Sequence, residues 1–360
     1  MLAHLKDEKL LLIALLAVAI AYPLEHTLLG SGQGIALISA LVLVAAIICA
    51  SMRVAHHAEL LAHRVGDPYG TMILTSAAVL VEVVVLGIMM SNEASPTLVR
   101  DTIYSAVMLD INGILGLAAL LGGIKHGEQA YNDDSAKSYS VMILTAMGIS
   151  MVVPEFIPEA SWKAYSAFTI VMMIMLYALF LRMQVGTHSY FFSYSYPEKR
   201  RVNPEEEQHD SKTLSISLLV VGVVVIGALA EVMSKTLDLG LEGSGAPPVL
   251  AALLVAAISA APEILTALRA AMANRMQSVV NIALGASLST VILTVPVMEG
   301  IALYTGQPFI MAMTPIQSVM IFITLIVAAI NLNDGETNAI EGMTHFALFA
   351  TFLMLTFIGL

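Results

Sequence analysis

Long apolar runs alternate with short polar breaks along almost the whole chain. Eleven of these runs are long enough, or nearly so, to cross about 30 Å of hydrocarbon as a helix. They lie near residues 9–24, 34–52, 70–91, 100–122, 138–157, 164–182, 214–233, 246–272, 277–303, 314–332 and 339–360. The pattern predicts an all-α integral membrane protein with about eleven transmembrane helices.

The composition agrees with this assignment and excludes several classes of protein. Apolar residues make up 58% of the chain and charged residues 12%, against about 45–50% and about 25% in soluble domains. The mean hydropathy is +0.85. The net charge of -11, without a large basic cluster, argues against nucleic acid as a partner. The single cysteine, Cys49, excludes intrachain disulfides, zinc-thiolate sites and iron-sulfur clusters, and we expect no cofactor.

The basic residues predict how the chain is oriented in the bilayer. When loops are assigned alternately to the two sides, every Lys and Arg except Arg100, Lys163 and Lys235 falls on one side. Because the basic side is usually cytoplasmic, we expect a multi-pass protein of the plasma (bacterial inner) membrane. Its N-terminus is then cytoplasmic and its C-terminus outside. The first run is short and begins beside Lys6 and Lys9, so a cleaved signal peptide is the alternative for it.

Two carboxylates lie well inside apolar runs, and their spacing predicts an internal repeat. Glu82 is in the third run and Glu263 in the eighth, 181 residues later. Five spans separate them, and an odd number means that the second copy is inverted, as in many secondary transporters. The expected units are an N-terminal helix at 1–33, a five-helix repeat at 34–195, an acidic cytoplasmic linker at 196–213 and an inverted five-helix repeat at 214–360. The linker either connects the two halves only or attracts and senses cations.

The energetic cost of the two glutamates points to function. An acidic residue at the centre of a membrane helix costs about 2.5–3.5 kcal/mol on insertion scales, which packing alone does not require. Removal from water favours the neutral form of a carboxylic acid, whereas a cation between two carboxylates restores their charge. Proton and cation then compete for the same oxygens. The structural alternative is that neighbouring hydroxyls satisfy both groups.

A cation site needs oxygen atoms beyond the two carboxylates, since calcium takes about six to eight ligands. The run after each glutamate supplies polar candidates: Asp110 and Asn112 in the fourth run, and Ser287, Ser289 and Thr290 in the ninth. Serine and threonine hydroxyls also donate hydrogen bonds to carbonyls of their own helix, so these residues need not be cation ligands.

Three further residues are candidates for a pathway to the site. Glu59 and His63 follow the inner end of the second run, and Glu231 lies near the outer end of the seventh. These two runs are partners in the predicted repeat, so the residues are expected at opposite mouths of one pathway. Alternatively, they are interfacial residues in contact with water.

Several stretches together resemble the calcium/cation antiporter superfamily, most closely its bacterial calcium/proton (sodium/proton) antiporter branch. The most specific is the loop HHAELLAHRVGDPYG at 56–70. PTLVRDTIYS at 96–105, LTVPV at 293–297 and HFALFA at 345–350 follow in the order of the family, so the resemblance covers nearly the whole chain.

The resemblance implies a central cation site built by two motifs similar to Gly-Asn-Ala-x-Glu. Their glutamates fall on Glu82 and Glu263. Where the wider family has Gly-Asn, this chain has Ala78-Val79 and Ser259-Ala260, so both asparagine amides are missing. The backbone carbonyls of Ala78 and Ser259 remain as candidate ligands, and sodium and potassium remain open as substrates beside calcium.

We therefore expect an antiporter that exchanges Ca²⁺, and also Na⁺, for H⁺ by alternating access. A Na⁺/H⁺ or K⁺/H⁺ antiporter with little calcium activity is the alternative, and a channel is the nearest rival. An intramembrane hydrolase built on Ser287 and His345 is the alternative of a different class. It is disfavoured because Ser289 stands where a Gly-x-Ser-x-Gly elbow needs glycine and because it leaves the two glutamates unexplained, so we expect no enzyme.

Overall fold

The structure is a computed structural model that describes residues 8–65, 69–92, 95–186, 188–194, 212–243, 245–247, 249–307 and 309–359. The regular secondary structure of this part of the chain is helical apart from one pair of two-residue strands. The helical elements are α2 (Lys9–Gly30), α3 (Gln33–Val65), α4 (Tyr69–Asn92), α5 (Leu98–Met108), η1 (Leu109–Leu115), α6 (Gly116–His126), α7 (Asp133–Met147), η2 (Gly148–Val152), η3 (Val153–Phe156), η4 (Glu159–Ser161), α8 (Trp162–Val185), η5 (Ser189–Phe192), α9 (Lys212–Leu241), α10 (Val249–Met272), α11 (Met276–Ser289), η7 (Thr290–Thr294), α12 (Val295–Thr305), α13 (Pro315–Asn331) and α14 (Ala339–Ile358).

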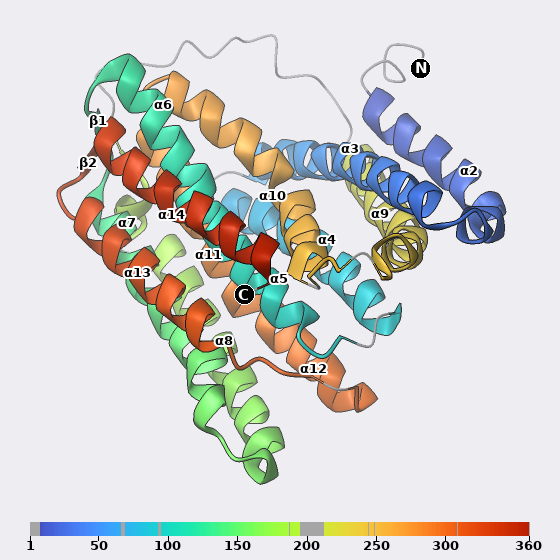
Figure 1. Cartoon of the computed structure of the whole chain (residues 1–360). Coiled ribbons are helices and arrows are strands. Elements are labelled where there is room, and N and C mark those ends of the chain that lie inside the picture. Colours follow the sequence, from blue (N-terminus) through green and yellow to red (C-terminus); the bar gives the residue numbers. More distant parts are fainter. Residues whose placement is uncertain are drawn as a thin grey trace.

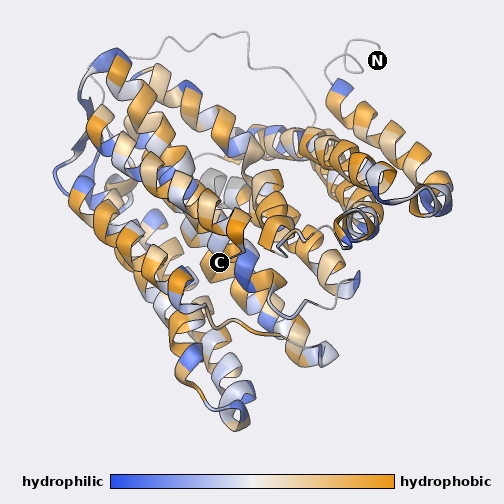
Figure 2. Ribbon diagram, viewed as in Figure 1, coloured by the Kyte–Doolittle hydropathy of each residue, from blue (hydrophilic) through white to orange (hydrophobic). Residues whose placement is uncertain are grey.

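The described residues contain ten helical segments that are long and apolar enough to cross a membrane. The tenth predicted span, α13, is apolar but has 17 residues, about 25 Å of helix. In two spans a π-helical segment lies between two α-helices: α5, η1 and α6 form one of them, and α11, η7 and α12 form the other. Apolar residues cover the flanks of the helices, and polar residues gather at their ends (Figure 2). The prediction of an all-α membrane protein with about eleven spans is confirmed.

The helices form a central bundle with a group of three at one side (Figure 1). That group is α2, α3 and α9, in which α3 and α9 run along each other. Gly240 of α9 permits the close approach, since a side chain there would come within 2.9 Å of the backbone of Leu37. Small residues at such positions let membrane helices pack backbone to backbone. The centre of the bundle contains α4, α5, α10 and α11.

Polar caps define where the last two helices begin. Thr314 and Gln317 form a capping box before α13, so their side chains satisfy backbone donors that the helix leaves free. Asn338 accepts hydrogen bonds from the first backbone groups of α14. Just before it, strand β2 (Glu336–Thr337) pairs antiparallel with β1 (Gln129–Ala130), which ties the α6–α7 connection to the α13–α14 connection.

The π-helical segments η1 and η7 lie at equivalent positions in their two spans. The segment η1 begins at Leu109 and η7 begins at Thr290, which is 181 residues later. The same interval separates Glu82 from Glu263, so the wider turns recur at the same distance from each glutamate. This recurrence supports the predicted repeat. Within the predicted linker, residues 196–211 lie outside the described part of the chain.

Candidate functional site

The carboxylate of Glu82 is buried in α4 and is held by hydroxyls from η7. Its side chain is 2% exposed. Thr290 and Thr294 donate to its Oε2 at 3.0 and 3.2 Å. Because the two threonines are four residues apart, about one turn, both hydroxyls lie on the same face of their helix. The second oxygen, Oε1, is buried and has no hydrogen-bond partner among the described residues. One oxygen is thus oriented and the other is available to a ligand.

Glu263 on α10 has a more open environment than Glu82. Its side chain is partly exposed, and its carboxylate makes no hydrogen bond within the described residues. α10 packs against η1 as α4 packs against η7. At the repeat interval of 181, the positions that correspond to Thr290 and Thr294 are Leu109 and Gly113, which carry no hydroxyl. The two glutamates are therefore related by position but not by their hydrogen bonds.

A third carboxylate, Asp110, lies in η1 in the same region. It is 2% exposed and accepts a hydrogen bond from Ser287 at 3.1 Å. The charge of Asp110 interacts more strongly with that of Glu263 than with that of Glu82. Among the described residues, however, no three His, Cys, Asp or Glu side chains converge closely enough to hold a metal ion together. A bound cation would thus need hydroxyl, backbone or water oxygens in addition to carboxylates.

The remaining predicted ligands have other neighbours. The amide of Asn112 donates to Thr324 at 2.7 Å and pairs with Nδ1 of His345 at 2.9 Å, so it faces α13 and α14. Ser289 is buried, but it is two residues from Ser287 and hence about 200° around the helix. Of the polar candidates named from the sequence, Asp110 and Ser287 are the ones that hydrogen-bond each other beside the glutamates.

The backbone candidates lie on the two glutamate helices, one turn before each carboxylate. Ala78 precedes Glu82 on α4, and Ser259 precedes Glu263 on α10. The hydroxyl of Ser259 donates to the carbonyl of Ala256 at 3.0 Å, within its own helix. The contribution of Ser259 to a cation site would therefore come from its backbone oxygen.

The three predicted pathway residues lie on α3 and α9. Glu59 is exposed on α3, and the side chain of His63 lies outside the described part of the chain. Glu231 accepts hydrogen bonds from Tyr22 at 2.6 Å and from Lys235 at 3.2 Å. The Tyr22 contact joins α9 to α2, so in this structure Glu231 connects helices at the side of the bundle.

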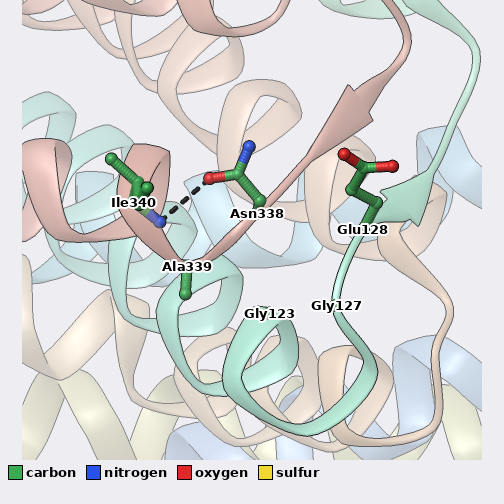
Figure 3. Close-up of a pocket in the computed structure, with 6 residues that line it drawn as sticks. All are labelled: Gly123, Gly127, Glu128, Asn338, Ala339 and Ile340. Carbon is green, nitrogen blue, oxygen red and sulfur yellow. Dashed lines mark hydrogen bonds between the residues drawn. The ribbon is translucent and has the colours of Figure 1, made fainter.

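A surface pocket at one end of the bundle is separate from this site (Figure 3). It lies where α6 ends and α14 begins, and its one acidic group is Glu128. Neither glutamate of the central site, nor Asp110, lines it. The lining residues are Gly123, Gly127, Glu128, Asn338, Ala339 and Ile340.

Of the two hydroxyls that hold Glu82, the sequence singled out Thr290 as a candidate ligand but not Thr294. Thr290 and Thr294 make the direct contacts to Glu82. Their sequence signal is a pair of hydroxyls four residues apart, and Thr294 lies in the LTVPV stretch that contributes to the family resemblance.

A family model described as sodium/calcium exchanger protein matches residues 35–186 and 214–358, nearly the whole chain. The protein belongs to this family. The interval between the two matched regions contains the whole of the predicted linker at 196–213. The resemblance inferred from the sequence motifs is confirmed.

Two curated relatives and one solved structure illustrate the similarity. The sodium-potassium/proton antiporter ChaA of Escherichia coli is 32% identical over 337 residues, which cover 91% of this chain and 92% of the relative. A Ca²⁺/H⁺ antiporter of Aphanothece halophytica is 24% identical and covers 72% and 73%. The structure of native YfkE superimposes with a TM-score of 0.74 at 19% identity, covering 96% of this chain and 99% of the other. The last match concerns the fold alone.

Proposed function

We propose that this protein is a secondary active antiporter that exchanges a cation for protons by alternating access. The observation that carries the proposal is the buried carboxylate of Glu82, with one oxygen held by Thr290 and Thr294 and the other without a partner. Glu263 and Asp110 lie near enough for their charges to interact. Membership of an exchanger family supports a transporter rather than an enzyme.

Charge balance gives the site its exchange chemistry. Ionised carboxylates in a region of low dielectric bind a cation strongly, whereas an empty site with ionised carboxylates is costly. Protonation of the carboxylates removes both the cost of burying their charge and their attraction for the cation. The site then changes its exposure from one side to the other either with a cation or with protons. This alternation couples the two fluxes.

The proposed substrate is Ca²⁺, with Na⁺ carried through the same site. Carboxylate, hydroxyl and backbone oxygens in one region favour a divalent ion. Na⁺ or K⁺ exchange with little calcium activity is the second candidate. It is favoured by the replacement of both motif asparagines and by the E. coli relative, whose name specifies sodium and potassium.

The serine hydrolase alternative is disfavoured by the partners of its two residues. Ser287 donates to Asp110, and Nδ1 of His345 pairs with Asn112. A nucleophile and its base would have to pair with each other instead.

The proposed location is the bacterial inner membrane, with the N-terminus in the cytoplasm and the C-terminus outside. The support is the asymmetry of the basic residues, of which only Arg100, Lys163 and Lys235 fall on the outer side. Cysteine labelling of loops in intact cells tests this orientation.

Purified protein in sealed liposomes tests the activity. An imposed pH gradient is monitored with a trapped dye while Ca²⁺, Na⁺ and K⁺ are added in turn. We expect Ca²⁺ and Na⁺ each to dissipate the gradient, and liposomes with Glu82→Gln protein to behave like empty ones. Cation flux that leaves the pH gradient intact would indicate a channel and overturn the proposal.

A further inference from the structure

A fourth acidic side chain, Glu299, is buried in α12 outside the cation site. It is 2% exposed. Its Oε2 atom is buried and has no hydrogen-bond partner within the described residues. No Lys, Arg or His of the described chain forms an ion pair with it. A buried acid in a membrane helix is costly, and cation binding at Glu82 and Glu263 does not account for this one.

Glu299 lies on the same span as the hydroxyls that hold Glu82. It follows Thr294 by five residues, about 7.5 Å along the helix axis. It precedes Thr305, the end of α12, by six residues, or about 9 Å. The asymmetry of basic residues predicts that this end of the bundle faces the outside. Glu299 therefore lies at a depth between the outer face and the Glu82–Thr294 contact.

The helix packed against α12 provides polar neighbours for Glu299. This helix is α8, and the hydroxyl of its buried residue Ser166 donates to the Glu299 carboxylate. The preceding residue, Tyr165, is close enough to interact with the carboxylate charge, while its own hydroxyl donates to the carbonyl of Ile149 at 2.8 Å. The nearby Lys163 is exposed.

The other ionisable groups on the elements that pack against α12 are farther along their helices. On α8 they are Tyr177 and Arg182, more than two turns beyond Ser166. On α4 they are Tyr69, the first residue of the helix, and Glu82, and η7 carries none. Within the described residues, Glu299 is thus a single acid with one hydroxyl donor and no compensating cation.

We propose that Glu299 is a proton-binding residue that carries protons between the outer face and Glu82, on a route that the transported cation does not use. One carboxylate with a free oxygen is sufficient to bind a proton, whereas a calcium ion requires about six to eight oxygens. A proton from outside water neutralises Glu299, and its transfer towards Glu82 leaves Glu299 ionised again. The reverse sequence releases a proton to the outside.

The backbone between the two glutamates offers a polar step on this route. Pro296, near the start of α12, has no N–H group. A backbone carbonyl one turn earlier therefore lacks its helical donor and is available to a water molecule. Such a water and the Thr294 hydroxyl would bridge from Glu299 to Glu82.

The inference rests on the proposed antiport, and two transport assays separate them. The first assay measures cation uptake driven by a pH gradient. The second measures isotope self-exchange of ⁴⁵Ca²⁺ or ²²Na⁺ at equal pH, which requires the cation site but no net proton movement. For Glu299→Gln we expect proton-driven uptake to fall roughly tenfold or more, and self-exchange to stay within about twofold of wild type. Glu155→Gln, an exposed acid at the same end of the bundle, serves as the matched control and should change neither.

A second variant tests proton binding with the carboxylate in place. Ser166→Ala removes a donor to the ionised form, so the pH profile of proton-driven uptake should move to higher pH, while self-exchange at a fixed pH is preserved. A purely structural role would not move that profile. Parallel loss of both activities in Glu299→Gln, or loss of neither, would overturn the inference. Absence of proton-driven uptake in the wild-type protein would instead refute the antiport itself.

Discussion

The hydroxyl of Thr294 donates to Oε2 of Glu82 at 3.2 Å, across 212 residues of sequence. Thr290 adds a second hydrogen bond to the same oxygen at 3.0 Å. A carboxylate from one half of the protein is thus oriented by hydroxyls from the other half. Any rearrangement that separates α4 from η7 breaks both bonds. The contact therefore links the protonation of Glu82 to the relative position of the two halves.

The first prediction concerns these two hydroxyls. Thr290→Val and Thr294→Val each preserve shape but remove a donor that stabilises ionised Glu82. The protonated form is then favoured, and a higher pH is needed for the cation to displace the proton. A hydrogen bond to a charged group contributes about 1.5–3 kcal/mol, so the pH of half-maximal transport should rise by roughly one unit or more. The measurement is cation-dependent proton flux across a pH series.

The control for these variants is Thr236→Val. Thr236 is buried as well, but its hydroxyl bonds carbonyls of its own helix, α9. Its replacement should leave the pH profile in place. A profile unchanged in both η7 variants would show that their hydroxyls do not control the protonation of Glu82.

The second prediction is that Glu82→Gln and Glu263→Gln each abolish exchange while the protein stays folded in the membrane. The amide retains the volume of the acid but cannot carry the exchanged charge. Size-exclusion profiles in detergent check folding, and proton-coupled flux in liposomes checks activity. Appreciable flux in either variant would remove that glutamate from the exchange site.

The third prediction is a pH effect on stability at the start of α2. Glu8 bonds Nε of Arg53 at 3.0 Å and lies 3.2 Å from Nε2 of His57. Partial burial raises the pKa of Glu8, but Arg53 and His57 outweigh it and hold the pKa below its ordinary value. Ionised Glu8 thus contributes stability above that ordinary value, and this contribution is lost as the pH falls through the folded-state pKa.

Thermal unfolding in detergent between pH 7 and pH 3 measures this contribution. Glu8→Gln should destabilise the protein at pH 7 by about 1 kcal/mol, since the pair lies at the end of a helix and is only partly buried. The difference from wild type should vanish at low pH. Glu128→Gln, an exposed acid on a loop, is the control. A deficit of Glu8→Gln that persists at pH 3 would show that the ion pair is not its cause.

The spans and the two central glutamates were predictable because the bilayer imposes a simple rule on the sequence. Each helix requires about 20 apolar residues, so both the run boundaries and the acids inside them are conspicuous. The partners of those acids depend on how each helix is rotated, which a single sequence does not specify. Asp110 and Asn112 are two residues apart, and in the structure one bonds Ser287 while the other faces His345.

The hydroxyls of the ninth span illustrate the same limit. Ser287, Ser289, Thr290 and Thr294 are chemically similar, and the π-helical segment η7 changes the rotation of the helix among them.

The burial of Glu299 was not predictable from the sequence for another reason. It lies four residues from the end of the predicted run at 277–303, where an acid is expected to reach water. Packing of α8 against α12 buries it instead.

The last prediction concerns ion selectivity and depends on Asp110. Its carboxylate is buried, accepts a hydrogen bond from Ser287, and interacts with the charges of Glu263 and Glu82. If it faces the bound cation, Asp110→Asn removes one negative charge at nearly constant volume. A divalent ion then loses about twice the Coulomb energy of a monovalent one.

The apparent affinity for Ca²⁺ should therefore weaken more than that for Na⁺ in the Asp110→Asn variant. In wild-type liposomes, Na⁺ should inhibit Ca²⁺ uptake competitively, since both ions use one site. Ser287→Ala, which retains the charge of Asp110, should alter the ratio of the apparent affinities for Ca²⁺ and Na⁺ much less. The measurement is the concentration dependence of uptake for each ion at fixed pH. Equal losses for both ions, or no loss for either, would exclude Asp110 from the site and leave Glu82 and Glu263 as its charged ligands.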